Sequence, residues 1–358
     1  MTYTLSFEDG IDDALRQRVH ETLDALDVPE VRGPVDVRVL DGGAMNQNFV
    51  LRTLSTDLVL RIAGVEVDRF GVDRAQGLAA HREWQTAGIS PRLYAATLPS
   101  GDCVSQFVDA RTLDRAILQE PGTLESCVRA LNVAHHTPTV GGAWSIFDDI
   151  DRYRTLAEDE RLALPEDFSR FVVACDAIEL SLSTAEIPDV MAHNDLQLQN
   201  YLLADDGAWI IDLEYAAPAS PYLDLGMLYG YGELNPAQRD SLLETYFGFV
   251  RETDQHRLEL MHFAAALREA IWSVCAQPTL GEATGWSYAD WALRFFDKAR
   301  AVVSDPGFDD RVARAGRAQD DDRAFENAAR IAEANAGVFR ARAIGGELSA
   351  AASTGAVR

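Results

Sequence analysis

The chain has 358 residues, of which 47% are hydrophobic, 9% aromatic and 25% charged, a composition typical of an ordinary globular protein. A chain of this length can bury a large core, so we expect either one bilobal unit or two domains. The formal net charge of −25 argues against a nucleic-acid partner or an acidic membrane surface, because phosphate groups attract the opposite sign.

The sequence predicts a cytoplasmic protein without stable membrane insertion. Its N-terminus has no basic segment followed by an apolar stretch, and no apolar run is long enough to cross a bilayer. The four cysteines lack the paired spacing of a zinc site, and we expect them to be buried free thiols. The only lysine is Lys298, so no lysine near the N-terminus can hold a phosphate.

Residues 1–108 are predicted to form a small α+β lobe. Helical periodicity and β-type runs alternate there, and the turn-forming DGG separates the first two strands. The expected elements are a helix at 10–27, strands at 35–40, 48–54 and 57–64, a helix at 72–87, and strands at 90–98 and 103–110. The first three strands are expected to form an antiparallel meander.

Residues 109–303 are predicted to form a mainly helical lobe. The expected helices are 122–136, 148–161, 167–184, 236–253, 257–278 and 288–303. One β region interrupts them at 200–215, where two apolar runs flank the turn ADDGA and predict a hairpin. Beyond residue 303 we expect a helical extension at about 320–343 and a disordered tail over the last dozen residues.

The segment HNDLQLQN at 193–200 has the spacing H-x-D-x-x-x-x-N, and Asp212 follows twelve residues later at the end of an apolar strand. Phosphoryl transfer from ATP needs a carboxylate to deprotonate the attacking hydroxyl, and an amide oxygen and a second carboxylate to hold Mg²⁺. Asp195 is therefore the candidate base, and the candidate metal ligands are Asn200 and Asp212. His193 is expected to brace the loop.

Each of these polar residues, taken singly, is explained more simply as a loop residue or a cap. Their joint spacing, with the hairpin between them, favours a catalytic site.

Two features of the N-terminal lobe are candidate phosphate contacts. Gly42 and Gly43 lie at a tight turn between strands, where backbone amides can approach a phosphate, although such a pair is more often only a turn. Arg61 lies on a strand between apolar residues and either points outward or forks across two phosphate oxygens.

The combination of HNDLQLQN with IIDLEY at 210–215 resembles the choline/ethanolamine kinase branch of the aminoglycoside-phosphotransferase-like kinases. That branch shows H-N-D-x-Q-x-x-N followed by I-D-[FWL]-E-Y. The resemblance also covers GGAMNQNF, VLRIAG, SQFVDARTLD and LREAIWSVCAQ, and so runs from about residue 38 to 300. It implies a bilobal protein-kinase-like α+β fold, with an N-terminal antiparallel sheet lobe, a mainly helical C-terminal lobe, and ATP in the cleft.

By this resemblance Asp195 matches the catalytic base, while Asn200 and Asp212 match the Mg²⁺ ligands. Asp224 matches a buried aspartate that braces the catalytic loop. The residues expected at the nucleotide are Gly42, Gly43, Ala44, Met45 and Asn46 in the phosphate loop, Arg61, the hinge residues Gln106, Phe107 and Val108, and Gln197.

The residues expected at the acceptor are Glu214, Tyr215, Glu269 and Trp272. A cationic amine is bound by aromatic faces together with a carboxylate. Glu269 stands where eukaryotic choline kinases often have a tryptophan, and it shares a helix face with Trp272. Three further aromatic residues could complete the pocket: Trp286, Tyr288 and Trp291. For Trp286 and Trp291, packing in the core is the simpler interpretation.

The helix at 72–87 departs from the family pattern. The superfamily usually has a glutamate there that pairs with the phosphate-binding cation, whereas this chain has Gln76 and Gly77. Asp73 and Glu83 are the candidate replacements.

The expected function is an ATP- and Mg²⁺-dependent kinase of a small-molecule hydroxyl compound that bears a cationic amine, first of all choline or ethanolamine. Because Glu269 stands where a cage tryptophan is often found, an aminoglycoside or another hydroxylated metabolite is the alternative acceptor. A non-catalytic nucleotide-binding protein is disfavoured, because it would be expected to have lost Asp195, Asn200 or Asp212.

Overall fold

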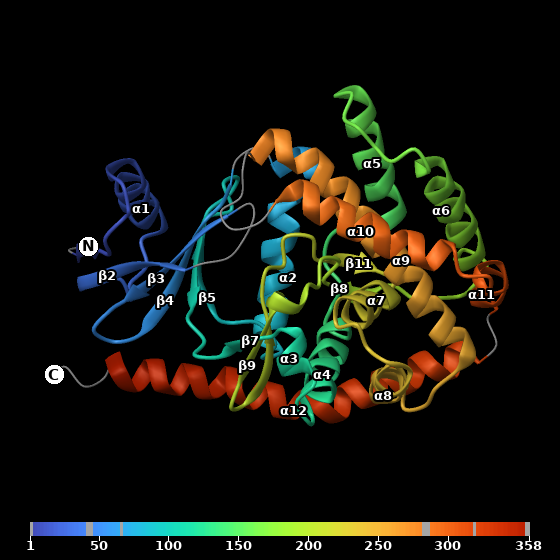
Figure 1. Cartoon of the computed structure of the whole chain (residues 1–358). Helices are drawn as coiled ribbons and strands as arrows, with labels where there is room; N and C mark the ends of the chain where they lie inside the picture. Colours follow the sequence, from blue (N-terminus) through green and yellow to red (C-terminus); the bar gives the residue numbers. More distant parts are fainter. Residues whose placement is uncertain (1–2, 41–45, 65–66, 281–286, 318–319, 355–358) are drawn as a thin grey trace.

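The computed structural model describes residues 3–40, 46–64, 67–280, 287–317 and 320–354. The chain forms a smaller lobe built on a sheet and a larger helical lobe, as the sequence predicts (Figure 1).

The N-terminal sheet has six strands in the order β1-β2-β3-β4-β6-β5. Their bounds are β1 Tyr3–Phe7, β2 Gly33–Leu40, β3 Gln47–Arg52, β4 Asp57–Ile62, β5 Leu93–Ala96 and β6 Cys103–Gln106. The predicted strands pair antiparallel, but β1, which was not predicted, pairs parallel with β2. The sheet is therefore mixed, because helix α1 (Asp13–Leu26) forms the crossover that a parallel pair requires.

Helix α2 (Arg74–Thr86) joins the sheet lobe to the helical lobe. Its buried residues Ala80 and Trp84 belong to the large hydrophobic cluster of the C-terminal lobe, not to the cluster beneath the sheet. At Gly77 the helix touches the chain that follows the hairpin: a β-carbon there would lie 2.6 Å from the carbonyl oxygen of Leu213. The helix therefore has no room for a larger side chain at that position.

Ten helices of the described residues follow α2. They are α3 Arg115–Leu118, α4 Thr123–His135, α5 Ile146–Asp159, α6 Phe168–Leu182, α7 Pro221–Tyr231, α8 Pro236–Phe247, α9 Glu252–Leu280, α10 Tyr288–Val303, α11 Phe308–Ala315 and α12 Asp321–Thr354. Sequence periodicity missed α3, α7 and α11. Helix α7 is buried nearly all round, so it shows no polar face from which a helical period could be recognised.

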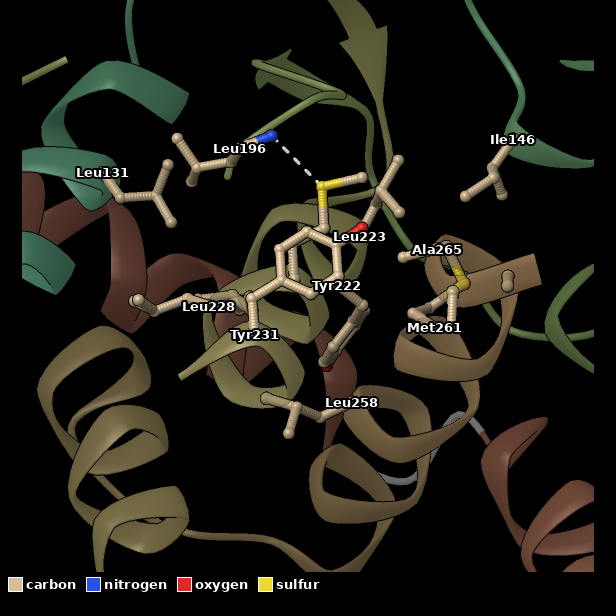
Figure 2. Packing of buried hydrophobic residues seen from close by; sticks show 14 of the residues in the cluster. Leu131, Ile146, Leu196, Tyr222, Leu223, Leu228, Tyr231, Leu258, Met261 and Ala265 are labelled. Carbon is tan, nitrogen blue, oxygen red and sulfur yellow. Dashed lines mark hydrogen bonds between the residues drawn. The ribbon is translucent and has the colours of Figure 1, made fainter. Parts of the chain in front are cut away.

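Helix α7 is part of the hydrophobic core of the helical lobe, and Figure 2 shows some of this core from close by. Its residues Tyr222, Leu223 and Leu228 pack among side chains from neighbouring elements, including Leu258 and Met261 of α9. The backbone N–H of Leu196, in the predicted catalytic loop, donates to the Sδ atom of Met227 at 3.1 Å, the dashed line in Figure 2. The loop is thus attached directly to the core.

Short strands position both ends of the predicted catalytic segment. Strand β8 (Val190–Ala192) pairs antiparallel with β11 (Ala217–Ala219), and β9 (Tyr201–Ala204) pairs antiparallel with β10 (Gly207–Ile210). The predicted hairpin is therefore confirmed. A third short strand, β7 (Arg111–Thr112), extends the hairpin on the β9 side.

Helix α12 runs along the helical lobe toward the sheet lobe (Figure 1). At its start Asn327 donates to the carbonyl oxygen of Phe247, and further along Arg342 donates to the carbonyl oxygens of Gly88 and Ala208. The helix continues to Thr354, so most of the tail that was predicted to be disordered is helical. Residues 355–358 lie outside the described residues.

All four cysteines are free and buried, as predicted. No helix within the described ranges is both long and apolar enough to span a membrane.

We predict that Gly88→Ala lowers the melting temperature and the free energy of unfolding by more than about 1 kcal/mol. Gly88 has a φ of +76°, and a β-carbon there would overlap the backbone carbonyl of Phe339 in α12. The matched control is Gly337→Ala in α12, where nothing lies within 4 Å, and we expect this variant to be stabilised by about 1 kcal/mol. Thermal and urea unfolding of both variants measure these changes, and equal stability of the two would contradict the packing of α12 against Gly88.

Candidate active site

The catalytic loop begins at a buried carboxylate. Asp224, at the start of α7, accepts hydrogen bonds from the backbone N–H of His193 at 2.7 Å and of Asn194 at 2.9 Å. The ring of His135 contacts the same carboxylate at 2.9 Å and is itself bonded to the hydroxyl of Tyr246. The structure confirms that Asp224 braces the loop, and it places His135 as a second brace on the same carboxylate.

His193 connects the loop to the end of the hairpin. Its Nε2 atom lies 2.9 Å from the carbonyl oxygen of Ile211, so this nitrogen is the donor, and its Nδ1 atom accepts from the backbone N–H of Asp195 at 3.3 Å. An imidazole that donates from one nitrogen and accepts with the other is neutral. His193 therefore braces the loop, as the sequence predicts.

Asn194 and Asp212 have left-handed backbones, with φ of 65° and 67°. Asparagine tolerates this conformation, and its side chain here donates to the carbonyl oxygens of Tyr215 and Ala217 at 3.0 and 3.2 Å. Aspartate, like asparagine, adopts this conformation more readily than most residues do. These bonds attach the catalytic loop to the segment that carries Asp212.

Asp195, Asn200 and Asp212 meet as the spacing predicts. The Nδ2 atom of Asn200 donates to the backbone carbonyl oxygen of Asp195 at 3.0 Å. The backbone carbonyl oxygen of Asn200 accepts from the backbone N–H of Ile211, the neighbour of Asp212, at 2.9 Å. Burial, and then the charge of Glu214, raise the pKa of Asp212 to about 6, and the charge of Asp195 adds to the rise. A cation at this position would relieve the repulsion.

The donor set fits Mg²⁺. The described residues contain no cluster of three histidine, cysteine or acidic residues arranged to hold a metal. Magnesium at kinase sites does not need such a cluster, because it takes one or two protein oxygens and completes its shell with phosphates and water. The carboxylate of Asp212, and the amide oxygen of Asn200, whose nitrogen is already bonded, fit that demand.

Arg61 is held by acidic residues of the C-terminal lobe. Its Nη1 atom lies 3.3 Å from Glu214 Oε1 and 3.4 Å from Asp212 Oδ1, and its Nη2 atom donates to the carbonyl oxygen of Gly101. Neither replacement suggested from the sequence pairs with it in the structure, and Asp73 instead caps α2 by accepting from the backbone N–H of Gln76. The predictions for Asp73 and Glu83 are wrong. The backbone of 213–214 occupies the space that a side chain on α2 would need.

Glu214 lies beside two of the predicted nucleotide contacts, Arg61 and Asn46. Besides Arg61, its carboxylate accepts a hydrogen bond from the side chain of Asn46 at 3.1 Å, and the oxygen of that side chain accepts from the backbone N–H of Gly64. Glu214 was predicted to contact the acceptor, whereas the structure places it with the phosphate-loop residue Asn46. The other predicted phosphate-loop residues, Gly42, Gly43, Ala44 and Met45, lie outside the described residues.

The predicted hinge follows β6. The backbone N–H groups of Gln106 and Phe107 donate to the carbonyl oxygens of Arg92 and Asp57, so they hold this segment to the sheet. The contact of adenine with Gln106, Phe107 and Val108 stays a prediction.

Sequence reasoning missed Arg268, the residue on α9 before Glu269. This arginine is 2% exposed, its Nη1 atom donates to Asp195 Oδ1 at 3.1 Å, and its Nε atom donates to Asp149 Oδ2 at 2.8 Å. Its guanidinium lies 4.5 Å from the ring centroid of Tyr215, so it covers a face that was predicted to meet the acceptor. An arginine within the apolar stretch FAAALREAIW was the available signal, because buried arginines need partners.

Glu269 lies close to the catalytic loop with aromatic neighbours. Its Oε1 atom accepts from Trp291 Nε1 at 2.7 Å and from Gln197 Nε2 at 3.2 Å. The sequence predicts that Gln197 contacts the nucleotide, whereas its side chain is bonded to Glu269, a predicted acceptor residue. Trp272 packs against Tyr288 with ring centroids 6.0 Å apart. Trp291 was read as core packing, yet its indole N–H binds Glu269.

Burial, and then the charge of Asp195, raise the pKa of Glu269 to about 7, although Trp291, Arg268 and Gln197 stabilise its ionised form. Trp286, the remaining aromatic candidate, lies outside the described residues.

We predict that Glu214→Gln raises the KM for ATP about tenfold, equivalent to about 1.4 kcal/mol, and changes kcat less. The physical reason is that the substitution removes one of the two carboxylates that align Arg61. Glu83→Gln on α2 is the matched control, with no change expected. Steady-state kinetics with varied ATP measure the effect, and equal KM values for the two variants would show that Glu214 does not position Arg61.

Comparisons with known proteins agree with this geometry. The family model for choline/ethanolamine kinases matches residues 37–232. The protein LicA of Haemophilus influenzae is 24% identical over 270 residues, which cover 74% of this chain and 79% of LicA. A choline/ethanolamine kinase family protein from Mesorhizobium loti superposes with a TM-score of 0.71 at 24% identity over 84% of this chain and 99% of that one.

The choline kinase LicA from Streptococcus pneumoniae superposes with a TM-score of 0.66 at 18% identity, over 80% of this chain and 98% of its own. These solved structures support the protein-kinase-like fold predicted from the sequence. The family model matches more than half of the chain. The chain belongs to the choline/ethanolamine kinase family, phosphotransferases that act on an alcohol group.

Proposed function

We propose that the chain transfers the γ-phosphoryl group of ATP, with Mg²⁺, to the hydroxyl of a cationic amino alcohol, and that choline and ethanolamine are the first acceptors to test. The observation that carries this proposal is the position of Glu269. Its buried carboxylate lies one residue from Arg268, which contacts Asp195, and it is bonded to Gln197 of the catalytic loop. A buried carboxylate is therefore attached to the loop that carries the candidate base.

Asp195 receives the proton in the proposed step. The hydroxyl oxygen of the acceptor attacks the γ-phosphorus, and the bond from that phosphorus to the oxygen bridging the β-phosphate breaks. ADP leaves with the bond's electron pair, and the hydroxyl proton passes to the Asp195 carboxylate. The bond from Arg268 to the Asp195 carboxylate, and the bond from the side-chain amide of Asn200 to the Asp195 backbone carbonyl, hold Asp195 in position for this step.

Arg61 supplies positive charge on the nucleotide side. It is the predicted phosphate contact, and its guanidinium lies 3.4 Å from the carboxylate of Asp212. When bound at Asn200 and Asp212, Mg²⁺ would neutralise the negative charge of the phosphates. Asn46 and Glu214 connect the end of the phosphate loop to Arg61, so that loop and arginine can respond together to the nucleotide.

Glu269 favours a primary ammonium over a quaternary one. A primary ammonium donates hydrogen bonds to a carboxylate, whereas a quaternary ammonium relies on aromatic faces around it. The face of Tyr215 beside the base is covered by Arg268, which leaves less aromatic surface for a trimethylammonium group. Ethanolamine therefore fits this pocket better than choline. The same feature also supports the second candidate, an aminoglycoside acceptor with primary amines.

We predict that Asp195→Asn lowers kcat by about 10²–10⁴-fold, because the amide cannot take the hydroxyl proton. ADP release is measured with ATP, Mg²⁺ and ethanolamine, choline or an aminoglycoside. The matched control is Asp189→Asn, an exposed position just before β8, for which we expect unchanged rates. If no acceptor gives the wild type a higher rate than Asp195→Asn, the proposed activity is wrong.

We predict that the KM for choline rises about tenfold between pH 8 and pH 6, with ATP saturating. Choline carries a permanent charge, so the acceptor does not titrate, whereas Glu269, with its pKa raised to about 7, takes up a proton as the pH falls. Protonation removes the negative partner of the ammonium, which weakens binding on the acid side. Glu269→Gln should show a high KM at every pH. The same pH profile in this variant as in the wild type would exclude Glu269 as the titrating group.

A further inference from the structure

A fixed positive charge lies inside the acceptor site. The guanidinium of Arg268 contacts the candidate base, and the ring centroids of three aromatic residues surround it at 4.5, 5.7 and 5.8 Å: Tyr215, Trp144 and Tyr153. An aromatic box beside a carboxylate is the arrangement that binds a ligand's cation. In this chain the protein's own arginine occupies it.

Arg268 is anchored and remains in place when a ligand enters. Its Nε atom is bonded to Asp149, a carboxylate with no exposed surface, and Asp149 also accepts from Arg152 at 2.6 Å. Moving the guanidinium away would break its bonds to two carboxylates and leave Asp149 buried with a single partner, which is strongly unfavourable. Phenols and carboxylates around Arg268 also raise its pKa, against the effect of burial, so it stays charged.

Two buried nitrogen atoms of this box lack a hydrogen-bond partner among the described residues: Arg268 Nη2 and Trp144 Nε1. Both are donors only, so each needs an oxygen that accepts. An ammonium group cannot serve, because it has no lone pair. A carboxylate serves well, since its two oxygens can accept several bonds and its charge complements that of the guanidinium.

We propose that the acceptor carries a carboxylate beside its hydroxyl and its cationic amine, and that Arg268 is the specificity-determining residue that binds this carboxylate. The substrate class is therefore the hydroxy amino acids. This inference rests on the proposed kinase activity and narrows its acceptor. The hydroxyl lies at Asp195, the amine at Glu269 and the carboxylate at Arg268 and Trp144.

The positions of the three groups suit such a small zwitterion. Arg268 and Glu269 are consecutive on α9, so their side chains leave the helix about 100° apart. Both nevertheless reach the catalytic loop, Arg268 through its bond to Asp195 and Glu269 through its bond to Gln197. A positive and a negative group thus flank the candidate base, as the carboxylate and the amine flank the hydroxyl-bearing chain of a hydroxy amino acid.

The test compares acceptors that differ only in the carboxylate. Ethanolamine is matched with L- and D-serine, and 3-amino-1-propanol with L- and D-homoserine, so that two spacings and both configurations are covered. Values of kcat/KM are measured from ADP release at saturating ATP, with choline as a further acceptor. We expect the wild-type protein to favour one carboxylated member of a pair over its decarboxylated partner by at least about tenfold.

The variant Arg268→Gln should lose this preference, with a larger fall in kcat/KM for the carboxylated member than for its partner. Arg268→Lys keeps the positive charge but lacks the guanidinium that can donate two parallel hydrogen bonds to a carboxylate, so it should retain part of the preference. The matched control is Arg152→Gln, which removes the other cation on Asp149 from a more exposed position and should leave the preference as in the wild type. A melting curve for each variant separates loss of fold from loss of selectivity.

Two outcomes would overturn the inference. The first is a wild-type protein that phosphorylates ethanolamine, 3-amino-1-propanol or choline as well as or better than every hydroxy amino acid. This result needs no variant and is independent of whether Arg268→Gln folds. The second is a folded Arg268→Gln that loses activity equally for both members of a pair or raises only the KM for ATP, which would assign Arg268 to the phosphates. No turnover of any acceptor above Asp195→Asn would refute the proposed kinase activity itself.

Discussion

The carboxylate of Asp224 is the constraint on which the site depends. It accepts the backbone N–H groups of His193 and Asn194, in a part of the core from which water is excluded. A buried carboxylate is unfavourable unless its lone pairs are used, so the loop and the core stabilise each other. From this point His193 and Asn194 extend bonds to the segment after the hairpin, and that segment places Asp212 beside Asp195.

The two lobes are joined by electrostatics on the cleft side and by packing elsewhere. Arg61 of the sheet lobe is paired with Asp212 and Glu214 of the helical lobe, so a nucleotide that attracts Arg61 would also act on Asp212, one of the two proposed metal ligands. Helix α2 touches the same segment at Gly77, and α12 bonds to Gly88 and to the hairpin. The two lobes are therefore in contact at Gly77, within α2, and at Gly88, just after it. A movement of one lobe relative to the other must change these contacts.

The acceptor side contains more charge than a cage for a quaternary amine requires. Buried charges are unfavourable unless they are paired, and here Arg268 is paired twice while Glu269 is bonded to an indole and an amide. Such an arrangement is rigid before the acceptor arrives, because each side chain is already oriented by its partners. A preorganised pair of opposite charges next to a base selects acceptors by their charge pattern rather than by apolar volume alone.

The sequence by itself determined the elements whose period is clear and the loop in which His193, Asp195 and Asn200 have a fixed local spacing, since such patterns depend on neighbouring residues. The sequence could not show that β1 pairs with β2, because a helix separates the two parallel strands along the chain. It could not show α7 either, because a helix that is buried all round has no polar face. Only the tertiary structure decided that Glu214 replaces a helix glutamate at Arg61, and that Arg268 reaches Asp195. Those pairings join residues 153 and 73 positions apart, and such distances leave no periodic trace in the chain.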